Sequence, residues 1–325
     1  MSPRPHVLLT DYAWADVELE RAILAAAGAE LVVAPTGDEE TLVQLAARHD
    51  VAAILTCWAR VTARVIAAAP RCRHVARLGI GLDNIDLSYC TSRGIPVTNV
   101  PDYCLTEVAE HTLALIFALG RKIAWYHAAT KAGRYQLQDG PPLRRLTGQT
   151  VGIVGLGGIG RQVAAKASAC GFRILVHTRR PPELGGIEFV SLEELLAASD
   201  FVTLHVPLTP QTQQLIGARQ LELMRPTACL INTARGGLID PVALAAALAA
   251  GKIAGAALDV QAPEPPDLQS PPYNDPRVIV TPHAAFASAE SLVDLRRRAA
   301  QQVAERLSGG WPPHVVNLPS AAAAK

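Results

Sequence analysis

The sequence has almost no excess of charge of either sign and no long uninterrupted apolar run. Its 30 basic and 29 acidic residues leave a formal net charge of +1. A nearly neutral chain has no global field that attracts nucleic acid or an anionic membrane. The longest apolar candidate, residues 109–119, is interrupted by Glu110, His111 and Thr112, and a membrane span needs roughly 20 apolar residues. We therefore expect neither a nucleic-acid partner nor a membrane partner.

Clustered cysteines and a leader segment are also missing. The N-terminal residues 1–6 are followed by only a few apolar residues before Asp11, too few for the hydrophobic region of a signal peptide. The cysteines are widely spaced and contain no CxxC pair, a usage typical of reduced thiols rather than of disulfides or a metal site. We expect a cytoplasmic protein without a metal. The six are Cys57, Cys72, Cys90, Cys104, Cys170 and Cys229.

Short apolar runs alternate with Ala- and Leu-rich stretches of helical period along most of the chain. This pattern is typical of parallel strands that crossover helices bury on both faces, so it predicts the α/β class. The length favours two domains. The first series of strands is predicted at residues 7–10, 31–34, 53–56 and 75–78, with helices at 17–27, 39–47 and 62–69. The second series is predicted at residues 151–155, 174–177, 201–205, 228–232, 256–260 and 278–281.

Two helical patterns lie outside these series. Residues 105–132 form a long pattern whose apolar residues exceed a single narrow stripe, and such a helix needs another surface to bury against. Packing within its own domain and pairing with a second subunit are both open. Residues 288–307 predict a final helix with Arg296, Arg297 and Arg298 in a row. Three consecutive residues span most of the circumference of a helix, so we interpret it as a solvated helix rather than a nucleic-acid patch.

A glycine-rich turn follows the predicted strand 151–155 and opens a helix. Gly155, Gly157 and Gly160 have the GxGxxG spacing of a dinucleotide-binding turn in its usual strand–turn–helix context. The first glycine permits the tight turn, the second lets the backbone approach a pyrophosphate, and the third lets helix and strand pack closely. The alternative is an ordinary glycine turn. We predict that the turn, with Gly158 and Ile159, binds a dinucleotide.

The residues after the next strand bear on the choice of cofactor. An acidic residue there normally binds the ribose 2′-hydroxyl, but Thr178, Arg179 and Arg180 stand at this place. A hydroxyl and two guanidiniums suit a 2′-phosphate, because arginine binds phosphate through two N–H donors. The alternative is a pair of exposed surface arginines. We expect a nicotinamide cofactor, NAD(P)(H), with the NADP form favoured.

Three further segments each follow a predicted strand: NTARGGLID at 232–240, LDVQAPEP at 258–265 and TPHAAFAS at 281–288. Together with ARLGIGLDNID at 76–86, they resemble the signature motifs of the D-isomer-specific 2-hydroxyacid dehydrogenases. The resemblance is strongest to the branch of the C-terminal-binding proteins and phosphoglycerate dehydrogenases. It implies two doubly wound, Rossmann-like parallel-sheet domains with the active site in the cleft between them. Residues 1–102 plus 285–325 would form the substrate-binding domain, and residues 103–284 the dinucleotide-binding domain.

The resemblance assigns a catalytic role to three residues. Arg235 matches the arginine that holds the substrate carboxylate and carbonyl, Glu264 the acid paired with histidine, and His283 the proton donor and acceptor. The chemistry calls for the same residue types. Reduction of a 2-keto acid adds a hydride to the carbonyl carbon and a proton to its oxygen, and histidine is the side chain that titrates near neutral pH. Arginine stabilises the charge on that oxygen. Taken singly, a strand-end cap, a solvated loop acid and a core histidine are the alternatives.

Other positions match residues of the family that line the cofactor or the substrate. Asp259 matches a contact to the nicotinamide carboxamide; the alternative is a strand-end aspartate that binds nearby backbone. Arg77 and a glycine turn after it match the substrate-facing loop, whose amides would bind the substrate carboxylate. That turn consists of Gly79, Ile80 and Gly81. The matches to cofactor-lining positions are His205, Val206, Pro207, Thr233 and Ala234.

These expectations amount to an oxidoreductase that transfers a hydride between a nicotinamide cofactor and a small 2-keto acid or D-2-hydroxy acid. The resemblance also implies a homodimer through the helix at residues 105–120. The alternative is a non-enzymatic, NAD(P)-sensing scaffold similar to the C-terminal-binding proteins of transcriptional repression.

Overall fold

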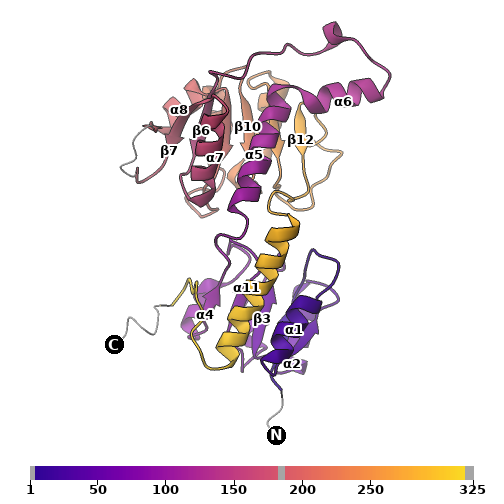
Figure 1. The fold of residues 1–325 in the computed structure, drawn as a ribbon, viewed down its shortest axis with the longest axis vertical. Coiled ribbons are helices and arrows are strands. Elements are labelled where there is room, and N and C mark those ends of the chain that lie inside the picture. The colour runs from indigo at the N-terminus through magenta and orange to yellow at the C-terminus, as the bar shows by residue number, and fades with distance from the viewer. Residues whose placement is uncertain (1–3, 182–186, 319–325) are drawn as a thin grey trace. The chain divides into compact units, whose positions relative to one another are not determined.

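The computed structural model describes residues 4–181 and 187–318, which divide into two compact units (Figure 1). Unit 1 comprises residues 4–103 and 288–318, and unit 2 the described residues of 104–287. The chain thus passes between the units after Tyr103 and after Ala287, one and three residues later than the sequence suggests (103 − 102; 287 − 284). Each unit is a parallel sheet with helices on its faces, which confirms the predicted fold class.

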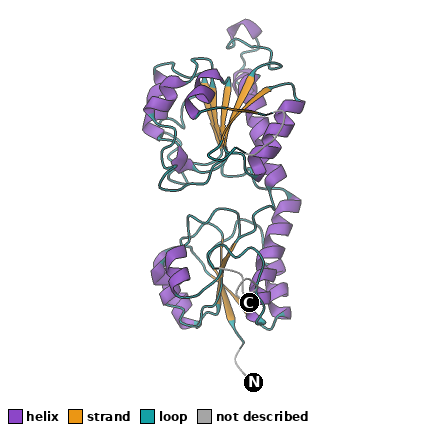
Figure 2. Cartoon of the chain, turned by 90° about the vertical axis from the view of Figure 1, so that its left-hand side faces the viewer, coloured by secondary structure: helices purple, strands orange, loops and turns teal. Residues whose placement is uncertain are grey.

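Unit 1 is built, in its described residues, on a five-stranded parallel sheet in the order β2-β1-β3-β4-β5. Helices cover both faces (Figure 2). Four strands match their predicted ranges to within one residue, whereas β5, with two residues, is too short to show a period. The strands are β1 (His6–Leu9), β2 (Glu30–Val33), β3 (Ala53–Thr56), β4 (Val75–Arg77) and β5 (Val97–Thr98). The helices are α1 (Glu18–Ala26), α2 (Glu39–Arg48), α3 (Ala63–Ala67), α4 (Leu87–Ser92) and α11 (Ala289–Leu307).

Helix α11 covers one face of the sheet of unit 1. Its residues Leu295, Ala299 and Val303 are fully buried, and the helix packs against β3 and β4. The interpretation of a solvated arginine run is wrong for Arg296, because only 11% of this side chain is exposed. Its Nε and Nη2 each donate to the carboxylate of Glu20 at 2.8 Å. Since that carboxylate is fully buried, it needs a paired cation, and Arg296 supplies the charge.

A buried histidine makes the stability of unit 1 depend on pH. His74 is fully buried, with its Nε2 2.9 Å from Thr98 Oγ1. Burial, with a smaller contribution from the charge of Arg306, lowers the pKa of His74 from 6.5 to about 3. The unfolded chain therefore binds a proton that folded unit 1 excludes. The resulting stability is fully present above pH 6.5 and is lost as the pH falls from 6.5 toward 3.

We expect the substitution His74→Gln to remove this part of the acid sensitivity. Between about pH 7.5 and about pH 5, the wild type loses about 2 kcal/mol of unfolding free energy through His74, whereas glutamine takes up no proton. Urea unfolding followed by tryptophan fluorescence in a Trp125→Phe background measures this loss. The remaining tryptophans all belong to unit 1: Trp14, Trp58 and Trp311. His127→Gln, at an exposed position, is the matched control; an equal loss in both variants contradicts the assignment.

Unit 2 is built, in its described residues, on a seven-stranded parallel sheet in the order β12-β11-β10-β9-β6-β7-β8. The strand order reverses between β6 and β9, and open α/β sheets bind ligands at the carboxyl ends of the strands around such a point. The strands are β6 (Thr150–Val154), β7 (Arg173–His177), β8 (Glu188–Phe189), β9 (Phe201–Leu204), β10 (Cys229–Asn232), β11 (Gly255–Leu258) and β12 (Val278–Val280). The helices are α5 (Leu105–Gly120), α6 (Ile123–Lys131), α7 (Gly158–Ala169), α8 (Leu192–Ala198), α9 (Ala218–Leu223) and α10 (Pro241–Ala249), with short 3₁₀ turns η1 (Leu137–Asp139) and η2 (Gly236–Leu238).

The long pattern at residues 105–132 is two helices, α5 and α6, rather than one. Lys122, between them, has a left-handed backbone with φ +54°, a conformation that ends a helix, and Gly120 before it has low helix propensity. The apolar face of α5, including Leu113 and Ile116, is buried against α7 and the sheet of unit 2. Of the two surfaces that the sequence left open for α5, the structure thus shows packing within its own unit.

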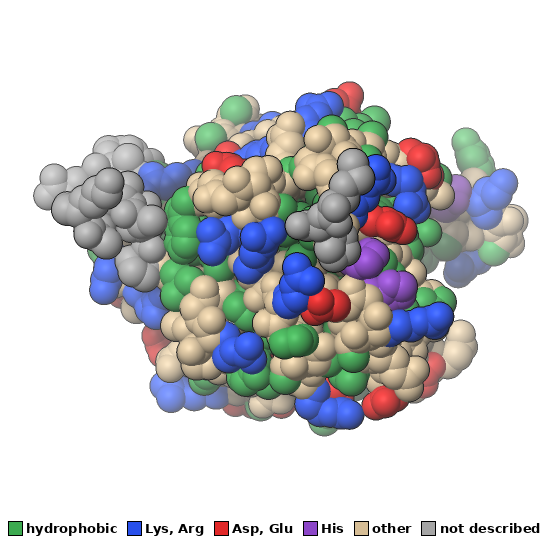
Figure 3. Space-filling model, turned by 90° about the horizontal axis from the view of Figure 1, so that it is seen from below, with side chains coloured by type: hydrophobic (Ala, Val, Ile, Leu, Met, Phe, Trp, Pro, Cys, Tyr) green, Lys and Arg blue, Asp and Glu red, His purple; other side chains and the backbone are tan. Residues whose placement is uncertain are grey.

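All six cysteines lie in the described residues, and none is joined in a disulfide. Over residues 4–181 and 187–318, no helix combines the length and apolarity needed to cross a bilayer. The same residues contain no group of three or more His, Cys, Asp or Glu side chains placed to hold a metal ion. On the face shown in Figure 3, basic side chains are interspersed with acidic, polar and hydrophobic ones. That nucleic acid is not a partner stays a prediction.

Candidate active site

The glycine turn after β6 is tightly packed at Gly155 and Gly160 and open at Gly157. Gly155 has φ +101°, and a Cβ there would lie 2.5 Å from the carbonyl oxygen of His205. A Cβ on Gly160 would collide with the carbonyl oxygen of Gly155, so this glycine lets α7 approach β6. A Cβ on Gly157, by contrast, would meet nothing within 4 Å. The open backbone at Gly157 and the amide groups at the start of α7 fit the pyrophosphate of a dinucleotide.

Residues at the carboxyl end of β7 lie next to this turn, because β7 pairs with β6. Thr178 is half-buried, and Arg179 and Arg180 are exposed. No carboxylate occurs in the described segment 178–181. The hydroxyl and guanidinium groups of this strand end are therefore accessible to an anionic ligand.

His205 follows β9, on the other side of the point where the strand order reverses. Its Nε2 is 3.0 Å from Thr203 Oγ1. Burial of the ring lowers the pKa of His205 to about 4, so the imidazole is neutral at pH 7 and is a poor proton donor. Val206 packs beside the glycine turn, with a side-chain carbon 2.7 Å from where a Cβ on Gly155 would lie, and Pro207 is exposed. This geometry suits a wall of a binding site better than a base.

The loop after β10 carries Arg235, and hydrogen bonds from the Asn232 side chain fix the backbone of this loop. Buried Asn232 donates from Nδ2 to the carbonyl oxygen of Arg235 at 2.8 Å and accepts from the backbone N–H of Ala234 at 3.0 Å. Nη1 of Arg235, a half-buried residue, donates to the carbonyl oxygen of Ala234 at 2.8 Å. Buried Thr233, just before them, pairs its hydroxyl with that of Thr112 at 2.9 Å. The arginine is thus presented from a rigid strand end.

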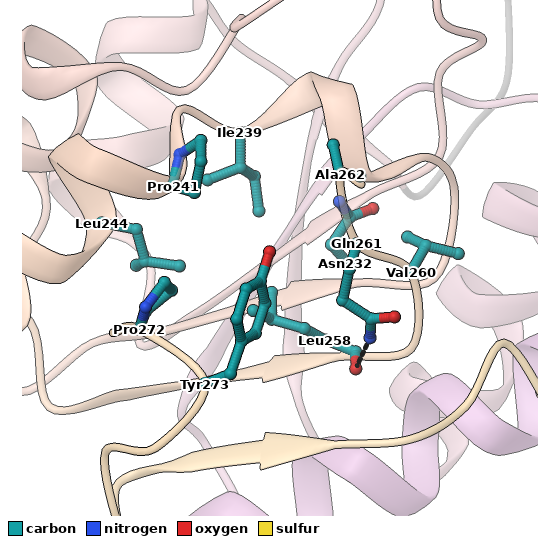
Figure 4. A pocket seen from close by; sticks show the side chains of 11 residues that line it. Asn232, Ile239, Pro241, Leu244, Leu258, Val260, Gln261, Ala262, Pro272 and Tyr273 are labelled. Carbon is teal, nitrogen blue, oxygen red and sulfur yellow. Dashed lines mark hydrogen bonds between the residues drawn. The ribbon is translucent and has the colours of Figure 1, made fainter. Parts of the chain in front are cut away.

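The loops that carry Arg235 and Glu264 are in direct backbone contact. A Cβ on Gly236 would collide with the backbone of Gln261, so only glycine permits this approach. Gln261 then fixes the acid: its backbone N–H donates to Glu264 Oε1 at 2.7 Å. Its side-chain amide donates to the carbonyl oxygen of Leu258 at 2.9 Å (Figure 4). The carboxylate is therefore held by its own loop.

A small apolar pocket lies behind these two loops (Figure 4). Its free volume is about 10 Å³, roughly the space for a single water. Tyr273 forms one wall, and burial raises the pKa of its hydroxyl. The pocket is too small for a substrate.

His283 and Glu264 form a hydrogen-bonded pair at the carboxyl edge of the sheet. Nδ1 of His283 lies 2.9 Å from Glu264 Oε2, and the two side chains are 23% and 34% exposed. Both groups are therefore reachable from solvent. His283 has φ +52°, and a residue other than glycine in this region carries strain of about 1–3 kcal/mol, a feature that clusters at functional sites. The structure brings together the acid and the histidine that the sequence paired.

Asp259 holds the backbone on both sides of His283. Its fully buried carboxylate accepts from the backbone N–H of Ala284 and of Ala285, each at 2.9 Å. Its carbonyl oxygen accepts from the backbone N–H of His283 at 2.8 Å. This is the backbone-binding role that the sequence left as the alternative, and contact of Asp259 with a nicotinamide carboxamide stays a prediction.

The predicted substrate loop lies at the carboxyl end of β4 in unit 1. Arg77 is 6% exposed, and its guanidinium lies under the following turn, where a Cβ on Gly79 would be 2.5 Å from Nη1. Ile80 accepts from Asn99 Nδ2 at 2.8 Å through its carbonyl oxygen, and Gly81 is half-buried. The buried guanidinium of Arg77 packs against this turn. Its contact with a substrate, like that of the turn, stays a prediction.

Sequence reasoning missed His111, a residue of α5 beside this site. Its Nε2 lies 3.1 Å from Thr281 Oγ1 and 3.6 Å from Asp259 Oδ1. In the sequence, His111 is only an interruption of an apolar run. The signal that points to it is the occurrence of polar residues on the face of an apolar helix that must be buried.

Residues 113–285 match the model of the D-isomer specific 2-hydroxyacid dehydrogenase, NAD binding domain, family. The chain belongs to this family. A glyoxylate reductase of Korarchaeum cryptofilum is 43% identical over 79% of this chain and 80% of its own length. A D-3-phosphoglycerate dehydrogenase of Mycobacterium leprae is 38% identical over 97% of this chain, which spans only 59% of that protein. These relatives support the phosphoglycerate dehydrogenase side of the branch.

Solved structures of this dehydrogenase family share the fold over almost the whole chain. One is an NADPH-dependent glyoxylate/hydroxypyruvate reductase of Sinorhizobium meliloti, solved in complex with NADP and malonate. It is 30% identical, covers 97% of each chain and superposes with a TM-score of 0.84. The relatives named here are enzymes, so the alternative of a non-enzymatic scaffold gains no support from them.

Proposed function

We propose that the protein is an NAD(P)-dependent dehydrogenase that interconverts a small 2-keto acid and its D-2-hydroxy acid. The observation that carries the proposal is the His283–Glu264 pair, 2.9 Å apart. The pair is tied through Gln261 and Gly236 to the loop of Arg235. The same edge of the sheet carries the glycine turn, so a cofactor site and acid–base groups belong to one unit.

Each residue of the group has a role in this reaction. A reduced nicotinamide dinucleotide, when bound, supplies the hydride. Arg235 binds the carboxylate and stabilises the charge that grows on the carbonyl oxygen. His283 gives a proton to that oxygen in reduction and takes it back in oxidation. Glu264, bonded to Nδ1, orients the ring for proton transfer.

An assay of cofactor oxidation tests the proposal. NADPH and NADH absorbance is followed with glyoxylate, hydroxypyruvate, pyruvate, phenylpyruvate and 3-phosphohydroxypyruvate. We expect turnover with at least one of these acids. Failure of all five with both cofactors, in protein shown to be folded, would defeat the proposal.

We also propose that NADPH is preferred to NADH. Hydrogen bonds to charged groups contribute roughly 1.5–3 kcal/mol each, discounted here because Arg179 and Arg180 are exposed and screened by salt. The expected preference is about ten- to a hundredfold in kcat/KM, which corresponds to about 1.4–2.8 kcal/mol. It should shrink as salt rises.

Variants at the end of β7 test this preference. Arg179→Ala and Arg180→Ala should weaken the use of NADPH with little effect on NADH, and Thr178→Asp should reverse the order. Arg173→Ala is the matched control, because this exposed arginine begins β7 and binds Glu188 instead. Equal or better use of NADH by the wild type at low ionic strength contradicts the preference.

We propose in addition that the protein is a homodimer, although the apolar face of α5 is buried in its own unit. Exposed apolar residues lie on the segment that follows α5, including Ile123, Tyr135 and Leu137. Beside this segment is a pocket of about 350 Å³, lined in part by Trp125, Pro141 and Phe201. A second copy that covers these surfaces would bury apolar area as obligate interfaces do, commonly about 2,000 Å² or more.

Light scattering at micromolar concentration should give twice the chain mass of 34.4 kDa. The double variant Tyr135→Asp/Leu137→Asp should give the monomer, because it places two charges in the interface. Leu268→Asp, at another exposed apolar position in unit 2, should leave the mass unchanged. A monomeric wild type refutes the dimer.

A further inference from the structure

Two adjacent polar residues of the apolar helix α5 bind the two loops that carry the proposed catalytic groups. Thr112 pairs with Thr233 in the loop after β10 at 2.9 Å, and His111 reaches Thr281 in the loop after β12 at 3.1 Å. The rest of the inner face of the helix is apolar. Packing alone does not require these bonds, so they point to a role at the edge of the sheet.

The direction of the hydrogen bonds follows from the single proton of a hydroxyl group. Thr281 Oγ1 donates its proton to Asp259 Oδ1 at 2.5 Å. Its oxygen must then accept from His111, so Nε2 of His111 carries a proton and donates. His111, Thr281 and Asp259 thus form a chain of hydrogen bonds that begins on α5 and ends at the buried carboxylate. His111 Nε2 also lies 3.6 Å from Asp259 Oδ1.

That carboxylate organises the turn at His283. It accepts from the backbone N–H groups of Ala284 and Ala285, while the Asp259 carbonyl oxygen binds the N–H of His283 itself. His283 keeps its left-handed backbone, φ +52°, only because the surrounding bonds determine it. A rotated Thr281 hydroxyl would remove one donor from Oδ1 and loosen this arrangement.

We propose that His111 is a positioning residue for His283. By donating to Thr281, it fixes the hydroxyl on Asp259 and keeps the turn that holds the His283 ring against Glu264. The inference rests on the proposed catalytic role of His283. It adds a residue of α5 that does not itself touch the substrate.

Kinetics of two substitutions at His111 provide the first readout. His111→Leu removes the donor, and kcat should fall about ten- to a hundredfold with the KM for the cofactor little changed, because misplacement of a catalytic group costs rate. His111→Gln places an amide N–H near the position of Nε2 and should restore kcat to within about threefold of the wild type. Equal losses in both variants overturn the proposal, since the donor would then not matter.

A second readout does not depend on activity. The rate at which diethyl pyrocarbonate acylates His283, measured by mass spectrometry of its peptide, should rise several-fold in His111→Leu and stay at the wild-type value in His111→Gln. Thr281→Val interrupts the chain of hydrogen bonds between His111 and Asp259, so it should raise the reactivity of His283 as His111→Leu does. It provides the same test if His111→Leu does not fold. Thr112→Val, on the same helix but bonded to the other loop, is the matched control for His283 reactivity.

The two readouts separate failure of the inference from failure of the proposed function. A protein inactive toward every 2-keto acid defeats the function and leaves the acylation experiment intact. Unchanged His283 reactivity in both His111→Leu and Thr281→Val overturns the positioning role, whatever the activity.

Discussion

Replacement of His283 by alanine should lower kcat by about 10²–10⁴-fold, the usual worth of a general acid, with cofactor affinity changed by no more than about threefold. The reason is geometric. The ring is bonded through Nδ1 to Glu264 at 2.9 Å and sits after β12, whereas the glycine turn that fits a diphosphate follows β6. His205, another histidine at this edge, has its pKa lowered to about 4 by burial and cannot replace His283 as proton donor at pH 7.

Single-turnover kinetics and a fluorescence titration of the reduced cofactor measure the two quantities. His127→Ala, at an exposed position on α6, is the control and should match the wild type. Because His283 and Glu264 act as a unit, the double variant with Glu264→Gln should be no slower than His283→Ala alone. A loss of less than tenfold in His283→Ala, with chemistry shown to limit the rate, removes His283 from the role.

The parallel sheets could be predicted because their central strands have a clear hydrophobic pattern in the sequence. Strands such as β3 and β9 are buried on both faces, so they read as continuous apolar runs between helical stretches. Strands β5 and β8 have two residues each, and two residues define no period. The turn at Lys122 was hidden for a related reason, because a left-handed residue between two helices leaves the apolar pattern nearly intact.

The glycine turn could be predicted residue by residue, since each glycine is explained by the space around its own backbone. Gly155 and Gly160 meet backbone atoms, and Gly157 faces open space. Gly236 is confined in the same way as Gly155 and Gly160, but its partner is the backbone of Gln261 on another strand end. A contact between loops so distant in the sequence has no local signature.

Charged and polar groups were harder to assign because their partners lie far away in the chain. The neighbours of Arg296 in the helix indicate a solvated side chain, yet its partner is Glu20, which precedes it by 276 residues. His111 is likewise separated from Thr281 by 170 residues. Asp259, whose two roles the sequence could not separate, binds backbone 25 and 26 residues further on. Such partners become visible only when the strand order is known.

Arg235→Lys should lower kcat/KM by about 10²–10³-fold, the cost of removing a fixed donor from a developing oxyanion. The backbone at this position is held by Asn232, so lysine keeps a positive charge near the same place. It loses the planar pair of donors that binds a carboxylate and a carbonyl oxygen together. The variant thus separates the contribution of the positive charge from that of the planar pair of donors.

Steady-state kinetics with the best 2-keto acid, together with cofactor titration, decide the outcome. Arg219→Lys, an exposed arginine on α9 of the same unit, is the matched control and should behave as the wild type. The affinity for the cofactor should persist in Arg235→Lys, because the glycine turn proposed to bind the diphosphate follows β6, whereas Arg235 follows β10. A variant with near-normal turnover and substrate affinity would show that a point charge suffices, and Arg235 would then be a structural residue of its strand end.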